Sequence, residues 1–198
     1  MEEVDTASTE NKKERDVYIK VVYMWDTKGT IYTNQTRQFP FRYRSENCYI
    51  MVMVAVESNS ILVTPIKSRN NDELEHVYLL ILKRIKQTGV EVRKNVLDSK
   101  CSASMKELTK NICELELVPP VCHQRNIAEM AIRTFKSHFV SILSGVDPYF
   151  LMSLWDKLLP QSELTLNLLR QSNVTPNVSV HAHQFGNFDY DRMPLAPL

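Results

Sequence analysis

The chain has 198 residues, which is enough for about one domain and a short extension. Its 24 Lys and Arg residues against 23 Asp and Glu residues give a net charge of +1, which excludes a uniformly cationic nucleic-acid coat. Only four glycines occur, and no two share a loop, so the glycine-rich phosphate loops of nucleotide-binding proteins are excluded too. Any phosphate chemistry must therefore rely on side chains, metal ions or a helix terminus.

The N-terminal residues predict an intracellular protein. Residues 1–15 are charged and poor in apolar side chains, so we expect a disordered tail over residues 1–16 and no signal peptide. The longest apolar run, residues 50–56, is far shorter than the roughly 20 residues of a membrane helix. None of the four cysteines forms a C-x-x-C pair, which is typical of reduced thiols. We expect a protein of the nucleus or cytoplasm that is not secreted and has no membrane partner.

The residue pattern in the first third of the chain predicts β-strands. Residues 17–25 alternate as a strand or loose ribbon, and a turn at residues 26–29 leads to a β-branched strand over residues 30–36. Residues 48–56 are almost continuously apolar, which predicts a strand with both faces covered by helices. A third strand over residues 61–66 contains Pro65 and is therefore expected at a sheet edge.

Helical and strand patterns then alternate. We expect a helix over residues 71–87, ended by Gly89, and then a strand over residues 90–97. A capping box at Ser104 predicts the start of a short helix. A strand over residues 113–118 and a long amphipathic helix over residues 126–143 follow. Residues 148–170 read as helical and divided at Pro160, and residues 173–198 read as irregular. This order predicts an α/β fold with a mixed sheet covered on both faces. The predicted division is a tail (1–16), a core (17–145) and a helical and irregular extension (146–198).

Three polar positions are expected to meet at one edge of this sheet. Asn34 lies in the first short strand, Asp98 ends the fourth, and Glu129 lies in the first turn of the long helix. Carboxylates from separate elements are ligands that Mg²⁺ prefers. Two-metal phosphoryl chemistry also needs a bridging carboxylate, because the ions sit about 3.5–4 Å apart. The alternative is structural: Glu129 completes a capping box and Asp98 caps a loop.

The long helix also carries a basic face. Glu129, Arg133 and Lys136 are spaced i, i+4 and i+7 and share one side, with Arg125 at the helix N-terminus, where unpaired N–H groups favour phosphate. Such a face can contact a phosphodiester backbone without reading its sequence. It can equally be a solvated surface on which Glu129 and Arg133 form a weak ion pair.

An ordered series of motifs runs from about residue 19 to the end of the chain. The blocks are GTIYTNQTRQFP (29–40), CYIMV (48–52), SNSI (58–61), PIK (65–67), LD (97–98), VPP (118–120), NIAEMAIRTFK (126–136), LWDKLLP (154–160), LTLNLLR (164–170) and FDYDRMPLAP (188–197). Together they resemble the integrase catalytic core of LTR-retrotransposon and retroviral-type polyproteins. The resemblance implies a ribonuclease H-like five-stranded mixed sheet whose first three strands are antiparallel. It also implies a DNA-joining polynucleotidyl transferase that uses Mg²⁺ or Mn²⁺, has DNA as its partner and is compatible with a homo-oligomer.

The family has three catalytic acids, and this sequence differs from the family at the first of them. Asp98 falls on the family's second acid and Glu129 on its third, but the first acid falls on Asn34. In the family this carboxylate bridges both metals, so a neutral amide removes one negative charge from both sites. Arg37 stands where the family usually has glycine, and Lys100 adds positive charge beside Asp98. We therefore expect an integrase core whose DNA-integration chemistry is impaired or lost.

Two alternatives stay open. Asp26 or Glu57 lies outside the motif positions but close enough in sequence to substitute for the missing acid. The second alternative is a non-catalytic DNA-binding or protein-interaction module that keeps the fold, which would bind DNA without a metal ion and more weakly as salt rises. If Asn34, Asp98 and Glu129 were far apart in space, the chain would instead be an unrelated α/β domain.

Overall fold

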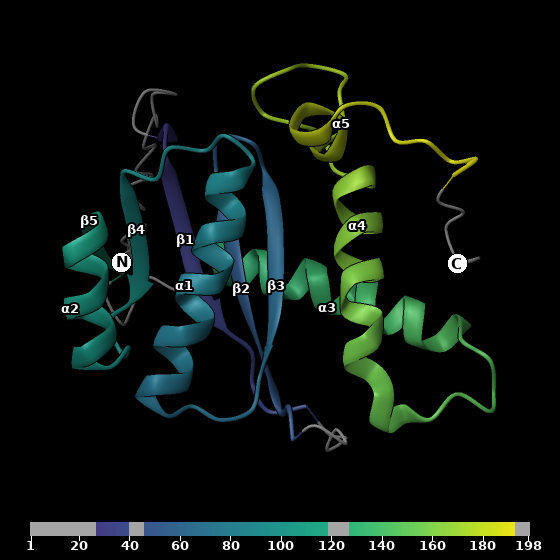
Figure 1. Ribbon diagram of the computed structural model, residues 1–198, viewed down its shortest axis with the longest axis horizontal. Helices are drawn as coiled ribbons and strands as arrows, with labels where there is room; N and C mark the ends of the chain where they lie inside the picture. The colour runs from purple at the N-terminus through teal and green to yellow at the C-terminus, as the bar shows by residue number, and fades with distance from the viewer. Residues whose placement is uncertain (1–26, 40–45, 119–126, 193–198) are drawn as a thin grey trace, which may run out of the picture.

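The computed structural model of the chain describes residues 27–39, 46–118 and 127–192, so the predicted tail (1–16) and the predicted strand at 17–25 lie outside the described residues. Its elements are, in order, β1 (Thr30–Gln35), β2 (Tyr49–Ala55), β3 (Ser60–Ile66), α1 (Asn71–Gln87), β4 (Lys94–Asp98), α2 (Ala103–Ile112), β5 (Glu114–Val118), α3 (Ile127–Gly145), a 3-10 helix η3 (Met152–Leu158), α4 (Leu159–Leu169) and α5 (Val180–Phe185). Figure 1 shows them around one sheet, with α4 beside β3 and α5 at the C-terminal end of α4.

The sheet has five strands in the order β3-β2-β1-β4-β5. The β1–β2 and β2–β3 pairs are antiparallel, whereas β1–β4 and β4–β5 are parallel. Parallel neighbours need a crossover connection, and α1 and α2 supply these crossovers. The predicted mixed sheet with three antiparallel strands is confirmed, and β3 lies at an edge as Pro65 indicates.

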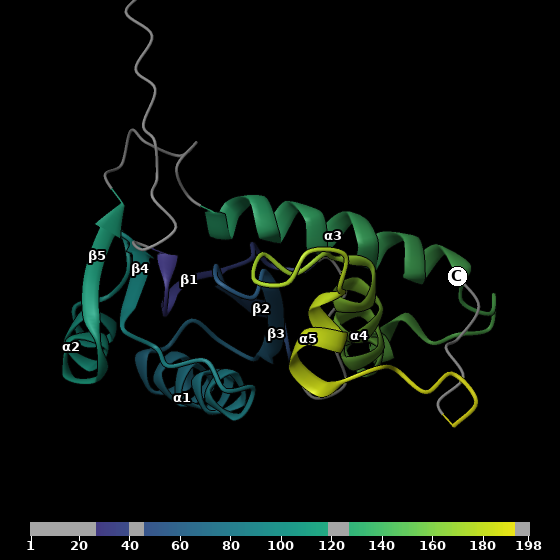
Figure 2. The ribbon, with the colours of Figure 1, turned by 90° about the horizontal axis from the view of Figure 1, so that it is seen from above.

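Both faces of β2 are buried. Met51, Met53 and Ala55 join one apolar cluster with α1, and the alternate residues join another with α3, η3 and α4. Figure 2 shows α1 and α2 on one side of the sheet and α3 on the other. Burial on two sides explains why β2 is apolar throughout instead of alternating. The large buried residues of the second cluster are Phe135, Phe139, Trp155, Leu159 and Leu166.

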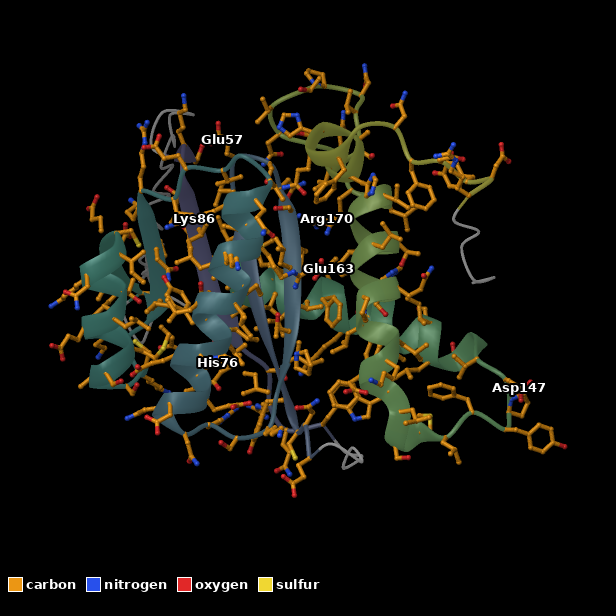
Figure 3. All side chains as sticks on the ribbon, in the orientation of Figure 1. Glu57, His76, Lys86, Asp147, Glu163 and Arg170 are labelled. Carbon is orange, nitrogen blue, oxygen red and sulfur yellow. The ribbon has the colours of Figure 1, made fainter. Side chains whose placement is uncertain are left out.

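The outer edge of β3 is closed by side chains instead of another strand. Asn167 on α4 accepts from the Ile61 N–H at 3.1 Å and donates to the Ile61 carbonyl at 2.8 Å. Glu163 accepts from the Val63 N–H at 2.8 Å, and Arg84 on α1 donates to the Val63 carbonyl at 3.0 Å. Figure 3 shows Glu163 on α4 beside β3. The edge therefore presents few open backbone groups for pairing with a further strand.

Two local predictions, on the start of α2 and on the C-terminal segment, need correction. Ser102, not Ser104, caps α2, because its hydroxyl accepts from the Met105 N–H at 3.3 Å. The predicted division near Pro160 is confirmed, because η3 ends at Leu158 and Pro160 stands in the first turn of α4, where its missing N–H has no helical partner to lose. The predicted irregular C-terminal segment contains α5, which is only six residues long and too short to show an apolar period.

Helix α1 has the predicted bounds, and Gly89 follows its C-cap with φ of +84°, a conformation that glycine adopts without strain. Among the helices of the described ranges, none combines the length and the apolar character needed to cross a bilayer.

Candidate functional site

The sheet topology brings Asn34 and Asp98 to the same edge. Thr33 on β1 pairs with Leu97 on β4 in parallel register, and Asn34 and Asp98 are the next residues on the two strands. Tyr32 packs against the cluster beneath α3, and alternation along β1 puts Asn34 on that same face. Glu129 lies in the first turn of α3. All three side chains line one cavity of about 600 Å³.

The same cavity is lined by three cationic residues, namely Arg37, Arg69 and Lys100. Arg69 was not singled out from the sequence, because it lies in the connection between β3 and α1, where no periodic pattern exists. Its guanidinium donates to the Thr36 carbonyl at 2.8 Å and stacks over the Tyr49 ring at 4.7 Å. These two contacts fix one cation at the cavity wall.

The side chain of Asn34 is turned back on its own strand. Its Oδ1 atom accepts a hydrogen bond from the Gln35 N–H at 2.8 Å. The other end of the amide is an NH₂ group, which donates hydrogen bonds and cannot bind a cation. Residue 34 therefore contributes neither a negative charge nor a second free oxygen to the cavity.

Asp98 has a structural role as well as a place in the cavity. Its Oδ1 atom accepts from the Lys100 N–H at 3.0 Å and from the Ser99 hydroxyl at 3.4 Å, so the carboxylate shapes the turn after β4. The Lys106 ammonium group donates to the Ser99 carbonyl at 2.9 Å and braces the same turn. The loop-capping interpretation of Asp98 thus holds alongside its position in the cavity.

A buried polar network lies beside this edge of the sheet. The Thr33 hydroxyl donates to Asn95 Oδ1 at 3.1 Å, and Asn95 Nδ2 donates to the Tyr78 hydroxyl at 3.0 Å. Burial raises the pKa of Tyr78 to about 12, so it stays a neutral phenol. Burial likewise raises the pKa of Cys101, a thiol in the cavity wall, which makes it a poor nucleophile at neutral pH.

Glu57 does not reach the position of the missing acid. It follows β2, and the antiparallel register pairs Ala55 with Ile31, near the start of β1, whereas Asn34 pairs with Val52. The Glu57 carboxylate accepts from the Gly29 N–H at 3.2 Å, before β1 begins. Figure 3 shows Glu57 at the same end of the sheet as Lys86 in the last turn of α1. This register does not support the alternative in which Glu57 substitutes for the missing acid, and Asp26 lies outside the described residues.

The basic residues of α3 stand apart from the cavity lining. Arg133 is exposed and Lys136 is half-buried, while the helix buries the opposite side, with Ala131 and Phe135, against the sheet. Arg125, predicted to bind DNA at the helix N-terminus, lies outside the described residues. Its role and those of Arg133 and Lys136 stay predictions.

The donors in the cavity do not fit a two-metal site. Among the described residues, two carboxylates, Asp98 and Glu129, share it with three amide and three cationic side chains. Across residues 27–39, 46–118 and 127–192, no group of three or more His, Cys, Asp or Glu residues comes together in a way that could hold a metal ion. The ligand that would bridge two ions is missing, so no reaction step through such ions follows from these residues.

Comparison with known proteins shows a likeness in fold. Neither a protein-family model nor a curated protein sequence matches the chain. Among solved structures, the catalytic core domain of BIV integrase is similar with a TM-score of 0.54 and 15% identity, over 79% of this chain and 93% of that one. A sequence identity this low supports a shared fold but not a shared activity. The chain has the ribonuclease H-like fold of a retroviral integrase catalytic core.

Proposed function

We propose that the chain is an integrase-type catalytic-core domain of a retrotransposon in which two-metal phosphoryl transfer is impaired because Asn34 replaces the first acid of the triad. The observation that carries this proposal is the shared cavity of Asn34, Asp98 and Glu129, at the carboxyl ends of β1 and β4 and the first turn of α3. Ligand sites in open α/β sheets commonly occupy this kind of edge.

The expected impairment has an electrostatic reason. Two divalent ions close together repel each other, and a bridging carboxylate offsets part of that repulsion. An amide at residue 34 lacks this charge, and Arg37 and Lys100 in the cavity wall add charge of the wrong sign. Asp98 and Glu129 are the remaining residues that would ligate Mg²⁺ or Mn²⁺.

Restoring the acid tests this proposal. We expect Asn34→Asp to raise Mn²⁺-dependent nicking of supercoiled plasmid DNA and joining of DNA ends by about a hundredfold over the wild-type chain, a gain typical of restored transition-state stabilisation. The double variant Asn34→Asp, Asp98→Asn serves as the matched control and should lose the gain. Robust activity of the wild-type chain, with Asn34 present, would contradict the proposal.

A second candidate is a DNA-binding module that needs no metal. It is favoured by the basic side of α3, where Arg133 is exposed and Lys136 half-buried, away from the buried face of that helix. DNA contacts there would go to the phosphate backbone. This function implies a nuclear or cytoplasmic location and is compatible with a homo-oligomer.

For this second candidate we expect DNA binding that is insensitive to EDTA and that weakens with salt. Replacing Arg133 and Lys136 with alanine should reduce the slope of log K against log[salt] by about 2, because each lost phosphate contact removes nearly one released counterion. Lys83→Ala with Lys110→Ala removes two exposed charges from α1 and α2 and is the control. An unchanged slope in the α3 variant, measured by fluorescence anisotropy, would remove these residues from the interface.

A further inference from the structure

The cavity at the ends of β1 and β4 has the charge balance of an anion site. Among the described residues, Arg37, Arg69 and Lys100 line it together with two carboxylates, Asp98 and Glu129. An oxygen-ligand site for divalent cations requires the opposite balance. Arg37 and Lys100 are exposed, so their charged groups can reach a ligand that enters from solvent.

The loop that carries Lys100 is fixed in place. Asp98 accepts from the Lys100 N–H at 3.0 Å, and the Cys101 N–H donates to the Asp98 carbonyl at 3.0 Å. The Lys106 ammonium group, bonded to the Ser99 carbonyl at 2.9 Å, adds a further positive charge beside this turn. A braced loop loses little conformational entropy when a ligand binds, which favours binding.

Two other features of the wall favour an anion. With its oxygen bonded to the Gln35 N–H, the Asn34 amide has an NH₂ group left to donate. Ser102 and Met105 in the wall belong to the start of α2, whose first turn contains no acidic residue. The positive end of the α2 dipole is therefore not offset by its own side chains.

We propose that this cavity binds a phosphate oxyanion directly, through the side chains of Arg37 and Lys100 and without a metal ion. Arg69, which is held by Thr36 and Tyr49, strengthens the positive field of the same wall. This inference rests on the proposed function in one respect, since both start from the neutral amide of Asn34 at the position where the integrase family has a carboxylate. The phosphate group can belong to a free anion or to a nucleic-acid strand, and the two sources are separated by experiment.

The test is calorimetric titration of the full chain in EDTA at constant ionic strength. Inorganic pyrophosphate is the probe in one arm, and a thymidine pentanucleotide without terminal phosphates is the probe in the other. We expect binding in at least one arm, and we expect Arg37→Ala with Lys100→Ala to weaken it about tenfold or more, as loss of charge-assisted hydrogen bonds does. The charge-matched control, Lys83→Ala with Lys110→Ala, should bind like the wild-type chain. Circular dichroism checks that both double variants are folded.

Asn34→Asp provides a second, opposite test in the same cavity. Its new negative charge should weaken pyrophosphate binding in EDTA about fivefold, from Coulomb repulsion at about 4 Å in water. Absence of binding in both arms, or equal binding by the Arg37 and Lys100 double variant, would overturn the anion site. Neither result bears on the Mn²⁺-dependent nicking assay, so a failed anion site and a failed catalytic assignment can be told apart.

Discussion

At the scale of single residues, Glu163 is a nearly buried acid that joins three elements. Its side chain is 14% exposed, pairs with Arg84 and accepts from the Val63 N–H at 2.8 Å. Burial raises the pKa of Glu163, and the Arg84 guanidinium offsets only part of this effect. The folded protein therefore holds the Glu163 proton to a higher pH than the unfolded chain does.

The sign of the resulting pH dependence follows from proton linkage. Because the folded pKa lies above the ordinary value of 4.5, the contribution of Glu163 to the free energy of unfolding is full below that pH and falls as pH rises through the folded pKa. Glu163→Gln cannot ionise and should not show this fall, so the difference in stability between the variant and the wild type should shift in favour of the variant as the pH rises above 4.5. Urea unfolding at several pH values measures it, and equal pH slopes for the two proteins would contradict the expectation.

Alanine at the same position separates charge from hydrogen bonding. Glu163→Ala leaves the Val63 N–H without its side-chain acceptor and should cost about 1–3 kcal/mol at pH 7. Glu163→Gln keeps an acceptor there and should cost less. If the two variants were equally unstable, the bond from Glu163 to β3 would contribute nothing.

At the scale of elements, α4 acts as the missing neighbour of β3. Asn167 occupies both the donor and the acceptor of Ile61, much as a paired strand would, and it is buried. Trp155, Leu159 and Leu166 of η3 and α4 belong to the same apolar cluster as the inner residues of β2 and β3. The C-terminal helices are thus part of the packing of the sheet, and the predicted domain boundary at residue 145 stays a prediction.

Removing the polar groups of Asn167 tests this closure. We expect Asn167→Leu, which keeps the size of the side chain, to lower the free energy of unfolding by about 2–4 kcal/mol because both backbone groups of Ile61 lose their partner. The control is Asn173→Ala, an exposed residue that donates to the Val56 carbonyl at 2.8 Å and should change stability by no more than about 0.5 kcal/mol. Equal unfolding midpoints for the two variants would contradict the role of Asn167.

At the scale of the whole molecule, the sequence predicted those parts of the fold that a local residue pattern indicates. The unbroken apolar run of β2 indicates burial on two faces, Pro65 indicates an edge, and the period of residues 71–87 gives the bounds of α1. The closure of β3 by Asn167 could not be predicted, because it joins residues more than 100 positions apart. The periodicity of apolar residues within a short segment contains no information on a contact between residues so far apart in the sequence.

The candidate site likewise contains residues that the sequence predicted and one that it did not. Asn34, Asp98 and Glu129 could be expected together because strand ends and helix starts meet at one edge of a sheet, and the structure brings them into one cavity. Arg69 could not be expected there, because a loop position has no period and its placement depends on Thr36 and Tyr49. The chemical roles of these side chains stay predictions.

The most direct measurement of the central claim is Mn²⁺ binding to the wild-type chain and to Asn34→Asp, by electron paramagnetic resonance of the free ion. If the amide at residue 34 disables the site, the wild-type chain should bind Mn²⁺ weakly, and Asn34→Asp should bind it about tenfold or more tightly, the effect expected of a restored ligand. Adding Asp98→Asn to that variant should remove the gain. Tight binding by the wild-type chain, or no gain on restoring the carboxylate, would contradict the account.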